Sequence, residues 1–296
     1  MIKNLCTWEL PNVWQMTDEL SLKKILKLAQ SIGYGGIQIK IETINKLVQE
    51  KSIDYVKGLF PAADIIPAGW MIHDAWRLDE NPYRKLLEDL PSFAKTSGGL
   101  GCRCCYIWVP NWSDERDYAE NFKWHIKRLR PIVSILKDYN LRLGLEWQGT
   151  KTLRVGRKYE FIHDMKGMLE LVEKVNQDNT VGLLLDSWHW YTSYGTVEKI
   201  KSLKGDQVVH VHICDAPKDI PVDEQLDLVR EVPGETGIID LVGFLKSLAE
   251  IGYNGPVEPS VPGSKTLENM SVEEAARMNY NALVRLWQSA GIVENR

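Results

Sequence analysis

The segment GLLLDSWHW, at residues 182–190, joins an apolar run to side chains that can do chemistry. Asp186 follows three leucines directly, and His189 comes three residues after it. An unbroken apolar run of this kind is typical of a strand that is buried on both faces in a parallel sheet. A carboxylate and an imidazole can bind a divalent metal ion or transfer protons. The segment therefore predicts functional groups at the end of a buried strand.

Two neighbouring strand-like segments carry groups of the same kind. RLGLEW contains Glu146 near its end, and QVVHVHICD contains His212. If these segments are neighbouring parallel strands, alternation lets Glu146, Asp186 and His212 point to one side. Two carboxylates do not crowd together without a cation or protons between them. The three residues therefore predict a site for one divalent ion, with Mn²⁺, Mg²⁺, Co²⁺ and Zn²⁺ as candidates.

Each of these residues taken alone would more often be a cap or a hydrogen-bonded loop residue. Their occurrence on three successive strands favours a site. His210 is expected to be a hydrogen-bonded interior residue. Cys102, Cys104 and Cys105 resemble a metal cluster only superficially, because adjacent strand residues face opposite sides.

Strand-like and helix-like segments alternate along the whole chain. The expected strands cover residues 4–8, 36–41, 63–70, 102–109, 142–147, 180–186, 207–215 and 255–261, and the expected helices cover 18–33, 43–57, 82–96, 115–139, 161–176, 196–203, 239–250 and 271–291. This pattern predicts one α/β domain over residues 1–296, a single (β/α)₈ TIM barrel with its chemistry at the carboxyl ends of the strands. A doubly wound open sheet is the alternative, but no glycine-rich phosphate turn follows the first strand.

The composition excludes several classes of protein. Hydrophobic residues make up 44% of the chain and the net charge is −4, which disfavours nucleic-acid and anionic-membrane surfaces. No apolar stretch approaches a membrane span of about 20 residues. The N-terminal residues lack a signal-peptide layout, and an odd count of five cysteines disfavours a secreted disulfide framework. We therefore expect a cytoplasmic protein with reduced thiols.

Aromatic and polar residues also gather at the expected strand ends. The candidates for substrate contact there are Trp8, Glu9, His73, Trp108, Trp147 and Trp188. Tryptophans offer flat, partly polar surfaces that suit sugar rings, although packing alone could also explain them. These residues predict a small carbohydrate or polyol as the substrate.

Several of these segments together resemble the xylose-isomerase-like TIM-barrel superfamily, the sugar phosphate isomerase/epimerase group. The segments are LCTWE, YIWVP, LEWQG, LLLDSWHW, HVHICDAP and the stretch that begins REVPGETGIID. The nearest pattern is that of the inosose (2-keto-myo-inositol) isomerases, and the resemblance covers nearly the whole chain. It implies that Glu146, Asp186 and His212 bind the metal ion. It also implies that His189 faces the substrate and that Arg230 belongs to the substrate site.

The last expected strand departs from the family pattern. The family's fourth metal ligand is a glutamate eight residues after the glycine that ends the preceding helix, and counting from Gly252 reaches Ser260. Glu258 lies two residues earlier, on the same face of the strand but about 7 Å deeper. Three alternatives stay open: Glu258 as the fourth ligand, water in that position, and pairing of Glu258 with His210. The second acidic residue of the sugar 3-epimerases is missing from WQGTKTLR.

The resemblance implies a divalent-metal-dependent isomerase or epimerase that acts on a sugar or keto-inositol through an enediolate. We expect Glu146 to move the proton between carbons, and His189 and Lys218 to polarise substrate oxygens. One alternative is a metal-dependent lyase or dehydratase that acts on a keto-sugar or glycoside with the same fold. Another is a non-catalytic sugar-binding barrel with a degenerate metal site. The sequence leaves open whether the chain forms a homo-oligomer.

Overall fold

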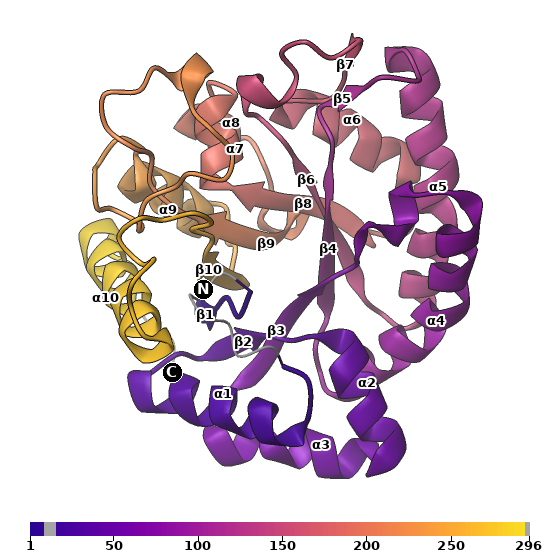
Figure 1. Cartoon of the computed structure of the whole chain (residues 1–296), viewed down its shortest axis with the longest axis vertical. Coiled ribbons are helices and arrows are strands. Elements are labelled where there is room, and N and C mark those ends of the chain that lie inside the picture. The colour runs from indigo at the N-terminus through magenta and orange to yellow at the C-terminus, as the bar shows by residue number, and fades with distance from the viewer. Residues whose placement is uncertain (9–15, 294–296) are drawn as a thin grey trace.

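The strands form a closed parallel barrel (Figure 1). The computed structural model describes residues 1–8 and 16–293, and within them eight strands pair in the order β1-β10-β9-β8-β6-β4-β3-β2. Their bounds are β1 Ile2–Leu5, β2 Gly36–Gln38, β3 Ile66–Met71, β4 Cys104–Val109, β6 Arg142–Trp147, β8 Val181–Asp186, β9 Val208–Ile213 and β10 Pro256–Pro259. Each expected strand overlaps an observed one, so the predicted TIM barrel is confirmed. One domain over the full range 1–296 stays a prediction.

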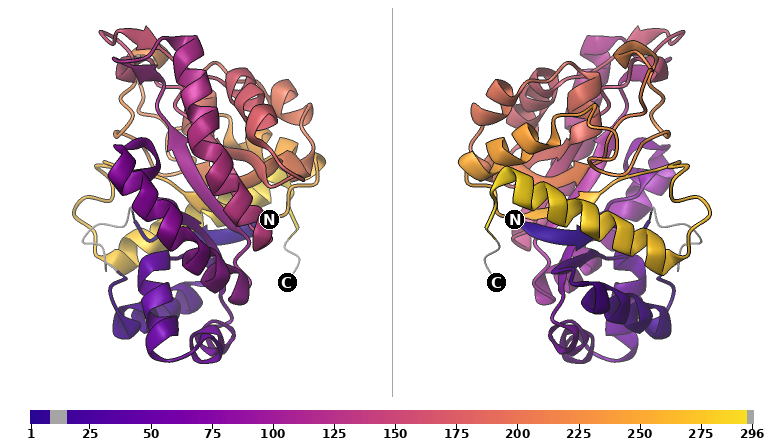
Figure 2. Two further views of the ribbon diagram at one scale, coloured as in Figure 1. Left: turned by 90° about the vertical axis from the view of Figure 1, so that its right-hand side faces the viewer. Right: turned by 90° about the vertical axis from the view of Figure 1, so that its left-hand side faces the viewer.

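Helices surround the barrel on its outside (Figures 1 and 2). They are α1 Glu19–Ile32, α2 Ile41–Glu50, α3 Ile53–Leu59, α4 Glu80–Gly99, α5 Tyr118–Asp138, α6 Met165–Val175, α7 Ser187–Thr192, α8 Val197–Lys201, α9 Leu241–Glu250 and α10 Val272–Ala290. Short 3₁₀ helices are η1 Pro61–Ala63, η2 Asp74–Arg77, η3 Lys151–Leu153, η4 Gly205–Gln207 and η5 Val222–Glu224. Among the helices of the described residues, none combines the length and hydropathy that a membrane span requires.

Two further features complete the architecture. The strands β5 Trp112–Ser113 and β7 Tyr159–Glu160 form a separate antiparallel pair. Helix α10 contacts α1, α9 and β1, so the last helix lies beside the first strand (Figure 2). This contact closes the helical layer where the first and last units of the barrel meet.

Side-chain caps define the beginnings of several helices. Asp18 accepts the backbone N–H of Ser21 at 2.8 Å at the start of α1, and Asp117 accepts that of Glu120 at 2.9 Å at the start of α5. Such caps satisfy N–H groups that have no partner within the helix. Helix α1 ends at Gly33, whose φ of 109° is available to glycine without strain from a Cβ atom.

Helix α7 was not predicted from the sequence. It follows β8 directly, and Asp186 caps it by accepting the Trp188 backbone N–H at 2.7 Å. A helix of six residues is too short for the apolar periodicity that indicates longer helices. Its position matters because it carries His189 at the mouth of the barrel.

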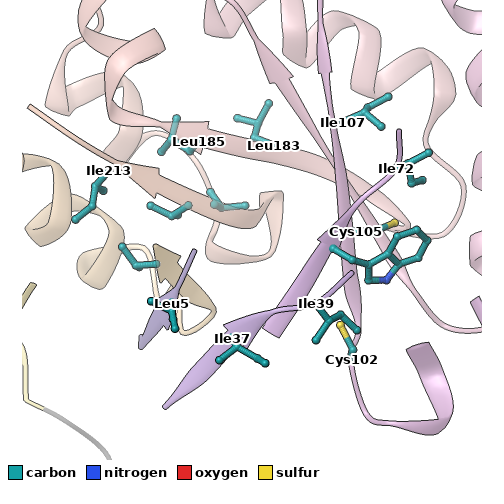
Figure 3. Close-up of a cluster of buried hydrophobic side chains, with 14 of the residues drawn as sticks. Leu5, Ile37, Ile39, Ile72, Cys102, Cys105, Ile107, Leu183, Leu185 and Ile213 are labelled. Carbon is teal, nitrogen blue, oxygen red and sulfur yellow. The ribbon is translucent and has the colours of Figure 1, made fainter. Parts of the chain in front are cut away.

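The hydrophobic core lies between the outer face of the barrel and the helices. Ile107, Leu183 and Leu185 belong to this core, and Figure 3 shows them with other labelled members projecting from the strands. Cys105 on β4 belongs to the same cluster, and so does Cys102, which precedes the strand. The strand residues that alternate with these core positions face the barrel interior, and they include the polar groups described below.

Candidate metal centre

Neighbouring strands bring the predicted ligands to one end of the barrel. The Cα atoms of Asp186 and His212 are paired between β8 and β9, and those of His212 and Glu258 between β9 and β10. Glu146 is the fifth residue of β6, which lies on the other side of β8. Glu258 is thus in register with His212 and Asp186, although it precedes Ser260 by two residues.

The geometry of these ligands fits a metal ion. His212 Nδ1 lies 3.5 Å from Glu146 Oε1 and 3.9 Å from Asp186 Oδ2. Ligand atoms around a tetrahedral ion with N and O bonds near 2.0–2.2 Å would be separated by roughly 3.3–3.6 Å. Two carboxylates and an imidazole nitrogen form a donor set that divalent ions accept. The residues present can therefore hold one divalent ion with a small adjustment of side chains.

Asp186 keeps its charge in spite of its burial. Its exposed fraction is 1%. Burial opposes ionisation, but Arg230, His189 and His212 hold the pKa of the Asp186 carboxyl below its ordinary value. The nearest of these groups is Arg230, whose Nη1 donates to Asp186 Oδ2 at 2.8 Å. An ionised Asp186 is the form that a metal ion requires.

The hydrogen bonds of His189 bear on which ring nitrogen carries the proton in the neutral form. His189 is 3% exposed, and its Nδ1 accepts the backbone N–H of Gly149 at 3.1 Å. A neutral imidazole that accepts at Nδ1 carries its proton on Nε2. That Nε2 atom lies 3.8 Å from Asp227 Oδ1 and 3.4 Å from Arg230 Nη2. With its proton on Nε2, His189 can donate to Asp227 or to a substrate oxygen, and Arg230 Nη2 then makes no hydrogen bond to the ring.

Arg230 lies inside the cluster and joins several of its members. Besides its bond to Asp186, Nη1 lies 3.3 Å from Ser260 Oγ, and Nε donates to the Asp227 carbonyl at 3.0 Å. Its guanidinium also lies 5.2 Å from the centre of the Trp188 ring. The family pattern implied substrate contact for Arg230, and the structure adds a direct bond to the carboxylate of Asp186, one of the predicted metal ligands.

The loop that carries Arg230 is anchored by Asp215. Asp215 and Glu231 exchange backbone hydrogen bonds of 2.8 and 2.9 Å. The Asp215 side chain accepts the backbone N–H groups of Gly237 at 2.7 Å and Ile239 at 3.0 Å. These bonds tie both ends of the loop to the end of β9, which explains how a residue in a long loop reaches the centre of the site.

Glu258 lies at the base of the site and is 0% exposed. Its Oε1 is 3.0 Å from His212 Nε2 and 3.3 Å from His210 Nε2. Burial opposes its charge, but the two histidines hold the pKa of Glu258 below its ordinary value. Burial would likewise lower the pKa of His212, but hydrogen bonds to Glu146 and Glu258 raise it well above the ordinary value. Burial lowers the pKa of His210, which supports its expected place in the barrel interior.

Trp147 and Trp188, two predicted substrate contacts, lie behind the site. Both rings are 0% exposed. Trp147 Nε1 donates to the carbonyl of His189 at 3.2 Å, and Trp188 Nε1 donates to Oγ1 of Thr150 at 2.9 Å. Because the described residues enclose both rings, neither offers a surface to a substrate in this structure. Instead, the two tryptophans fix α7 against the loop that follows β6.

Three other predicted contacts come from earlier parts of the chain. Trp8 and His73 follow β1 and β3, and the Cα atom of Trp108 on β4 pairs with that of Glu146 on β6. Trp8 is 39% exposed, and its ring centre lies 5.7 Å from that of His73. His73 Nε2 is paired with Glu42 Oε1 at 3.0 Å. Trp108 is partly buried, with the Arg77 guanidinium 4.2 Å from its ring centre. Substrate contact by Trp8, Trp108 and His73 stays a prediction.

The remaining two predicted residues are Lys218 and Glu9. Lys218 is exposed in the loop after β9, and no hydrogen bond or ion pair among the described residues joins it to Asp186 or Glu146. Its predicted role stays a prediction. Glu9 lies outside the described residues.

Sequence reasoning missed the polar residues that support the ligands from below. Tyr106 Oη lies 3.2 Å from Glu258 Oε1, and Asn4 Nδ2 also donates to Glu258. A signal for Tyr106 was available, because it lies two residues before Trp108 and therefore shares its strand face. Asn4 stood in an expected strand, but a single asparagine there does not indicate a partner on β10. Asp227 lies in a long loop, where no periodicity predicts its position.

Comparison with known proteins decides the family. The model of the family described as xylose isomerase-like TIM barrel matches residues 26–281 of the chain. The chain belongs to the xylose isomerase-like TIM barrel family. This membership confirms the resemblance that the strand-end motifs indicated.

Three relatives illustrate the range of the xylose isomerase-like family. An inosose isomerase of Bacillus velezensis is 27% identical over 240 residues, which are 80% of this chain and 82% of that protein. A 3-dehydroshikimate dehydratase of Pseudomonas aeruginosa is 34% identical over 134 residues, which are 45% of this chain and 20% of that protein. The solved structure of the IOLI protein with a binding zinc atom has a TM-score of 0.76 and 22% identity, and the match covers 99% of this chain and 100% of that chain.

Proposed function

We propose that this protein is a divalent-metal-dependent isomerase or epimerase that acts on a keto-inositol or an unphosphorylated sugar through an enediolate. The observation that carries the proposal is the approach of His212 Nδ1 to Glu146 Oε1 at 3.5 Å and Asp186 Oδ2 at 3.9 Å. The relationship to an inosose isomerase over 80% of the chain supports the choice of reaction. The zinc atom in the IOLI structure supports a metal ion, and the donor set also accepts Mn²⁺, Mg²⁺ and Co²⁺.

In this proposal, Glu146 takes the proton from the carbon beside the substrate carbonyl and returns it to the neighbouring carbon. Glu146 is 8% exposed, so its carboxylate is shielded from solvent where that proton would be held. A divalent ion bound by Glu146, Asp186 and His212 would supply positive charge for the enediolate oxygens. The same buried position keeps water from quenching the carbanion-like intermediate.

His189 has the properties of the group that donates a hydrogen bond to a substrate oxygen. The Gly149 N–H at 3.1 Å holds the proton of the neutral ring on Nε2. The Trp147 and Ser193 side chains bond the His189 carbonyl at 3.2 and 2.7 Å, which fixes the backbone from which the ring projects. Arg230, which bonds Asp186 at 2.8 Å, keeps that carboxylate ionised and turned into the site.

A lyase reaction is the second candidate. The partial match to a 3-dehydroshikimate dehydratase supports it, as does Ser260 in place of the family's strand-end glutamate. A lyase would begin with the same proton removal by Glu146 but would then expel a group from the next carbon. A non-catalytic sugar-binding barrel is a third alternative, and it would bind ligands without any exchange of carbon-bound hydrogen.

Proton NMR in D₂O separates these alternatives. The protein is loaded with Mn²⁺, Co²⁺ or Zn²⁺ and incubated with 2-keto-myo-inositol and with simple ketoses. We expect deuterium at the carbon beside the carbonyl and an isomeric product of unchanged mass apart from the label. An alkene or enone with loss of water would identify the lyase. Binding without deuterium incorporation would support the non-catalytic barrel.

The variant Glu146→Gln tests the assignment of the base. Because general-base catalysis contributes about 100- to 10,000-fold, we expect deuterium exchange to fall by at least about 100-fold. Glu250→Gln on the outer helix α9 is the matched control and should exchange like the original protein. Exchange in Glu146→Gln at the rate of the control would disprove the role of Glu146.

A further inference from the structure

A network of buried polar side chains lies beneath the candidate metal centre. Its central residue is Glu258, which is 0% exposed. Glu258 Oε2 accepts a hydrogen bond from Asn4 Nδ2. Glu258 Oε1 lies 3.2 Å from Tyr106 Oη, 3.0 Å from His212 Nε2 and 3.3 Å from His210 Nε2. Side chains from three other positions in the barrel therefore hydrogen-bond the two carboxylate oxygens, and His210 Nε2 lies close without a hydrogen bond.

The direction of the Tyr106 hydroxyl can be derived from its other partner. Gln38 Oε1 accepts the backbone N–H of Thr7 at 3.3 Å, which turns the NH₂ group of Gln38 toward Tyr106 Oη. The tyrosine oxygen thus accepts a bond from Gln38 and has one proton to donate. Glu258 Oε1 is the acceptor within reach at 3.2 Å. The network consequently presents donors to Glu258, and Glu258 serves as a pure acceptor.

The same reasoning fixes which nitrogen of His212 faces an ion. An ionised carboxylate can only accept, so His212 Nε2 carries a proton that it donates to Glu258 at 3.0 Å. A neutral imidazole with Nε2–H has its lone pair on Nδ1. That atom faces Glu146 and Asp186 at 3.5 and 3.9 Å. Without an ion, a proton on Nδ1 serves these two carboxylates, and a divalent ion bound between them would replace that proton.

Glu258 could ligate the ion itself only by giving up its present partners. Asn4 and Tyr106 are 0% and 3% exposed, so no solvent would replace the bonds that they lost. Leaving a buried polar group without a partner costs about 1–3 kcal/mol for each group. Two residues further along β10, Ser260 Oγ lies 3.3 Å from Arg230 Nη1, which also bonds Asp186. A guanidinium group thus lies where the family pattern places the carboxylate of a fourth ligand.

We infer that Glu258 is a positioning residue that holds His212 through Nε2, so that the ion has three protein ligands: Glu146, Asp186 and Nδ1 of His212. This inference rests on the proposed metal site and deepens it. Carboxylates that accept the second N–H of a ligating histidine fix its tautomer and its orientation. Here that carboxylate comes from β10, and the Asn4 and Tyr106 bonds hold it in place.

Metal binding by three variants tests the inference. Zn²⁺ affinity is measured by competition with a chromophoric chelator, and the Co²⁺ form is examined by visible absorption, for Glu258→Gln, Glu258→Ala and Tyr106→Phe. Thermal unfolding identifies any variant that no longer folds. Tyr106→Phe is the matched control, because it removes a donor to the same Glu258 oxygen and leaves the His212 bond intact.

We expect Glu258→Gln to bind one equivalent of metal with affinity reduced by roughly 10- to 100-fold, as for other partners of ligating histidines. Its Co²⁺ spectrum at saturation should match that of the original protein, because the ligand atoms are unchanged. Glu258→Ala should bind more weakly still, and Tyr106→Phe should lose less affinity than either. A changed Co²⁺ spectrum in Glu258→Gln, or failure to load it, would identify Glu258 as a ligand and overturn the inference.

Nitrogen-15 NMR of the histidine rings reports which nitrogen of His212 carries the proton. A role of Glu258 in stability alone would leave that result unchanged. In the Zn²⁺ form we expect His212 to carry its proton on Nε2, and we expect Glu258→Ala to lose the protection of that proton from exchange with water. A proton on Nδ1 would overturn the inference. If the original protein binds no metal at all, the proposed function fails; if it binds metal through Glu258, only the positioning role fails.

Discussion

The two sides of the barrel mouth hold their charges in different ways. On the side formed by β6, β8, β9 and β10, Asp186 is 1% exposed and pairs with Arg230 at 2.8 Å. On the side that follows β2 and β3, the side chains of His73 and Glu42 are 43% and 36% exposed and pair at 3.0 Å. Both pairs have short contacts, but only the first is removed from water.

This difference in exposure determines how strongly each charged side chain depends on its partner. A buried charge is tolerated only when partners hold it, so each group on the first side is held by a partner from another strand or from the loop after β9. An exposed pair contributes little because water screens it and both side chains lose freedom. We therefore expect substitutions on the first side to have large effects on activity and stability, and those on the second side to have small ones.

The largest expected effect is that of Asp186→Asn. This change removes one charge from the proposed ligand set and leaves Arg230 without its carboxylate partner. We expect loss of stoichiometric metal and a fall in deuterium exchange of at least about 100-fold. Metal analysis by mass spectrometry and the exchange assay measure these effects. Asp178→Asn, at an exposed pair with Lys137, is the control; full metal content in Asp186→Asn would contradict the proposed centre.

Arg230→Met tests the buried pair of Arg230 and Asp186 by removing the arginine. The change leaves Asp186 buried without its nearest positive charge, so we expect the metal-free protein to lose about 3–5 kcal/mol of unfolding free energy. Urea unfolding measures the loss. Arg277→Met removes an exposed pair with Glu273 and should cost about 0.5 kcal/mol or less. Equal losses in the two variants would show that burial does not distinguish the pairs.

Gly149→Ala tests how closely the loop after β6 must approach α7. A Cβ atom at this position would lie 2.3 Å from the His189 carbonyl oxygen, which is backbone and cannot rotate away. We expect α7 to shift, the Gly149 bond to His189 Nδ1 to weaken, and both stability and turnover to fall. Gly58→Ala in α3 has no atom within 4 Å of its Cβ and should be neutral or slightly stabilising. Turnover of Gly149→Ala at the level of Gly58→Ala would contradict the predicted crowding.

The smallest expected effect concerns His73. The hydrogen bond to Glu42 raises the pKa of His73 above its ordinary value of 6.5. The pair therefore stabilises the fold fully below that ordinary pKa, and this contribution is lost as the pH rises through the raised pKa. Because both side chains are more than a third exposed, the contribution should stay below about 1 kcal/mol and weaken with salt. NMR titration should show a lower pKa for His73 in Glu42→Gln; an unchanged pKa would exclude this cause.

The barrel was predictable because its signals are local. Buried parallel strands are apolar throughout, and the helices between them repeat at 3.6 residues, so the expected and observed strands overlap in all eight units of the described residues. The convergence of Glu146, Asp186 and His212 followed from their places near strand ends. Helix α7 was not predicted because six residues are too few to show the apolar periodicity of a helix. The burial of Trp147 was not predicted either. A tryptophan at the end of a strand gives the same sequence signal whether it faces the barrel mouth or the helices.

The sequence by itself determined the alternation of strands and helices. It also determined the end of the barrel where the three predicted ligands approach one another. Only the tertiary structure decided the partners of Glu258 and Arg230. Asn4 and Glu258 are 254 positions apart, and Asp186 and Arg230 are joined through a long loop. Periodicity specifies which face of a strand a residue occupies, but the pairing of buried charges depends on strand register and loop path, which no local pattern contains.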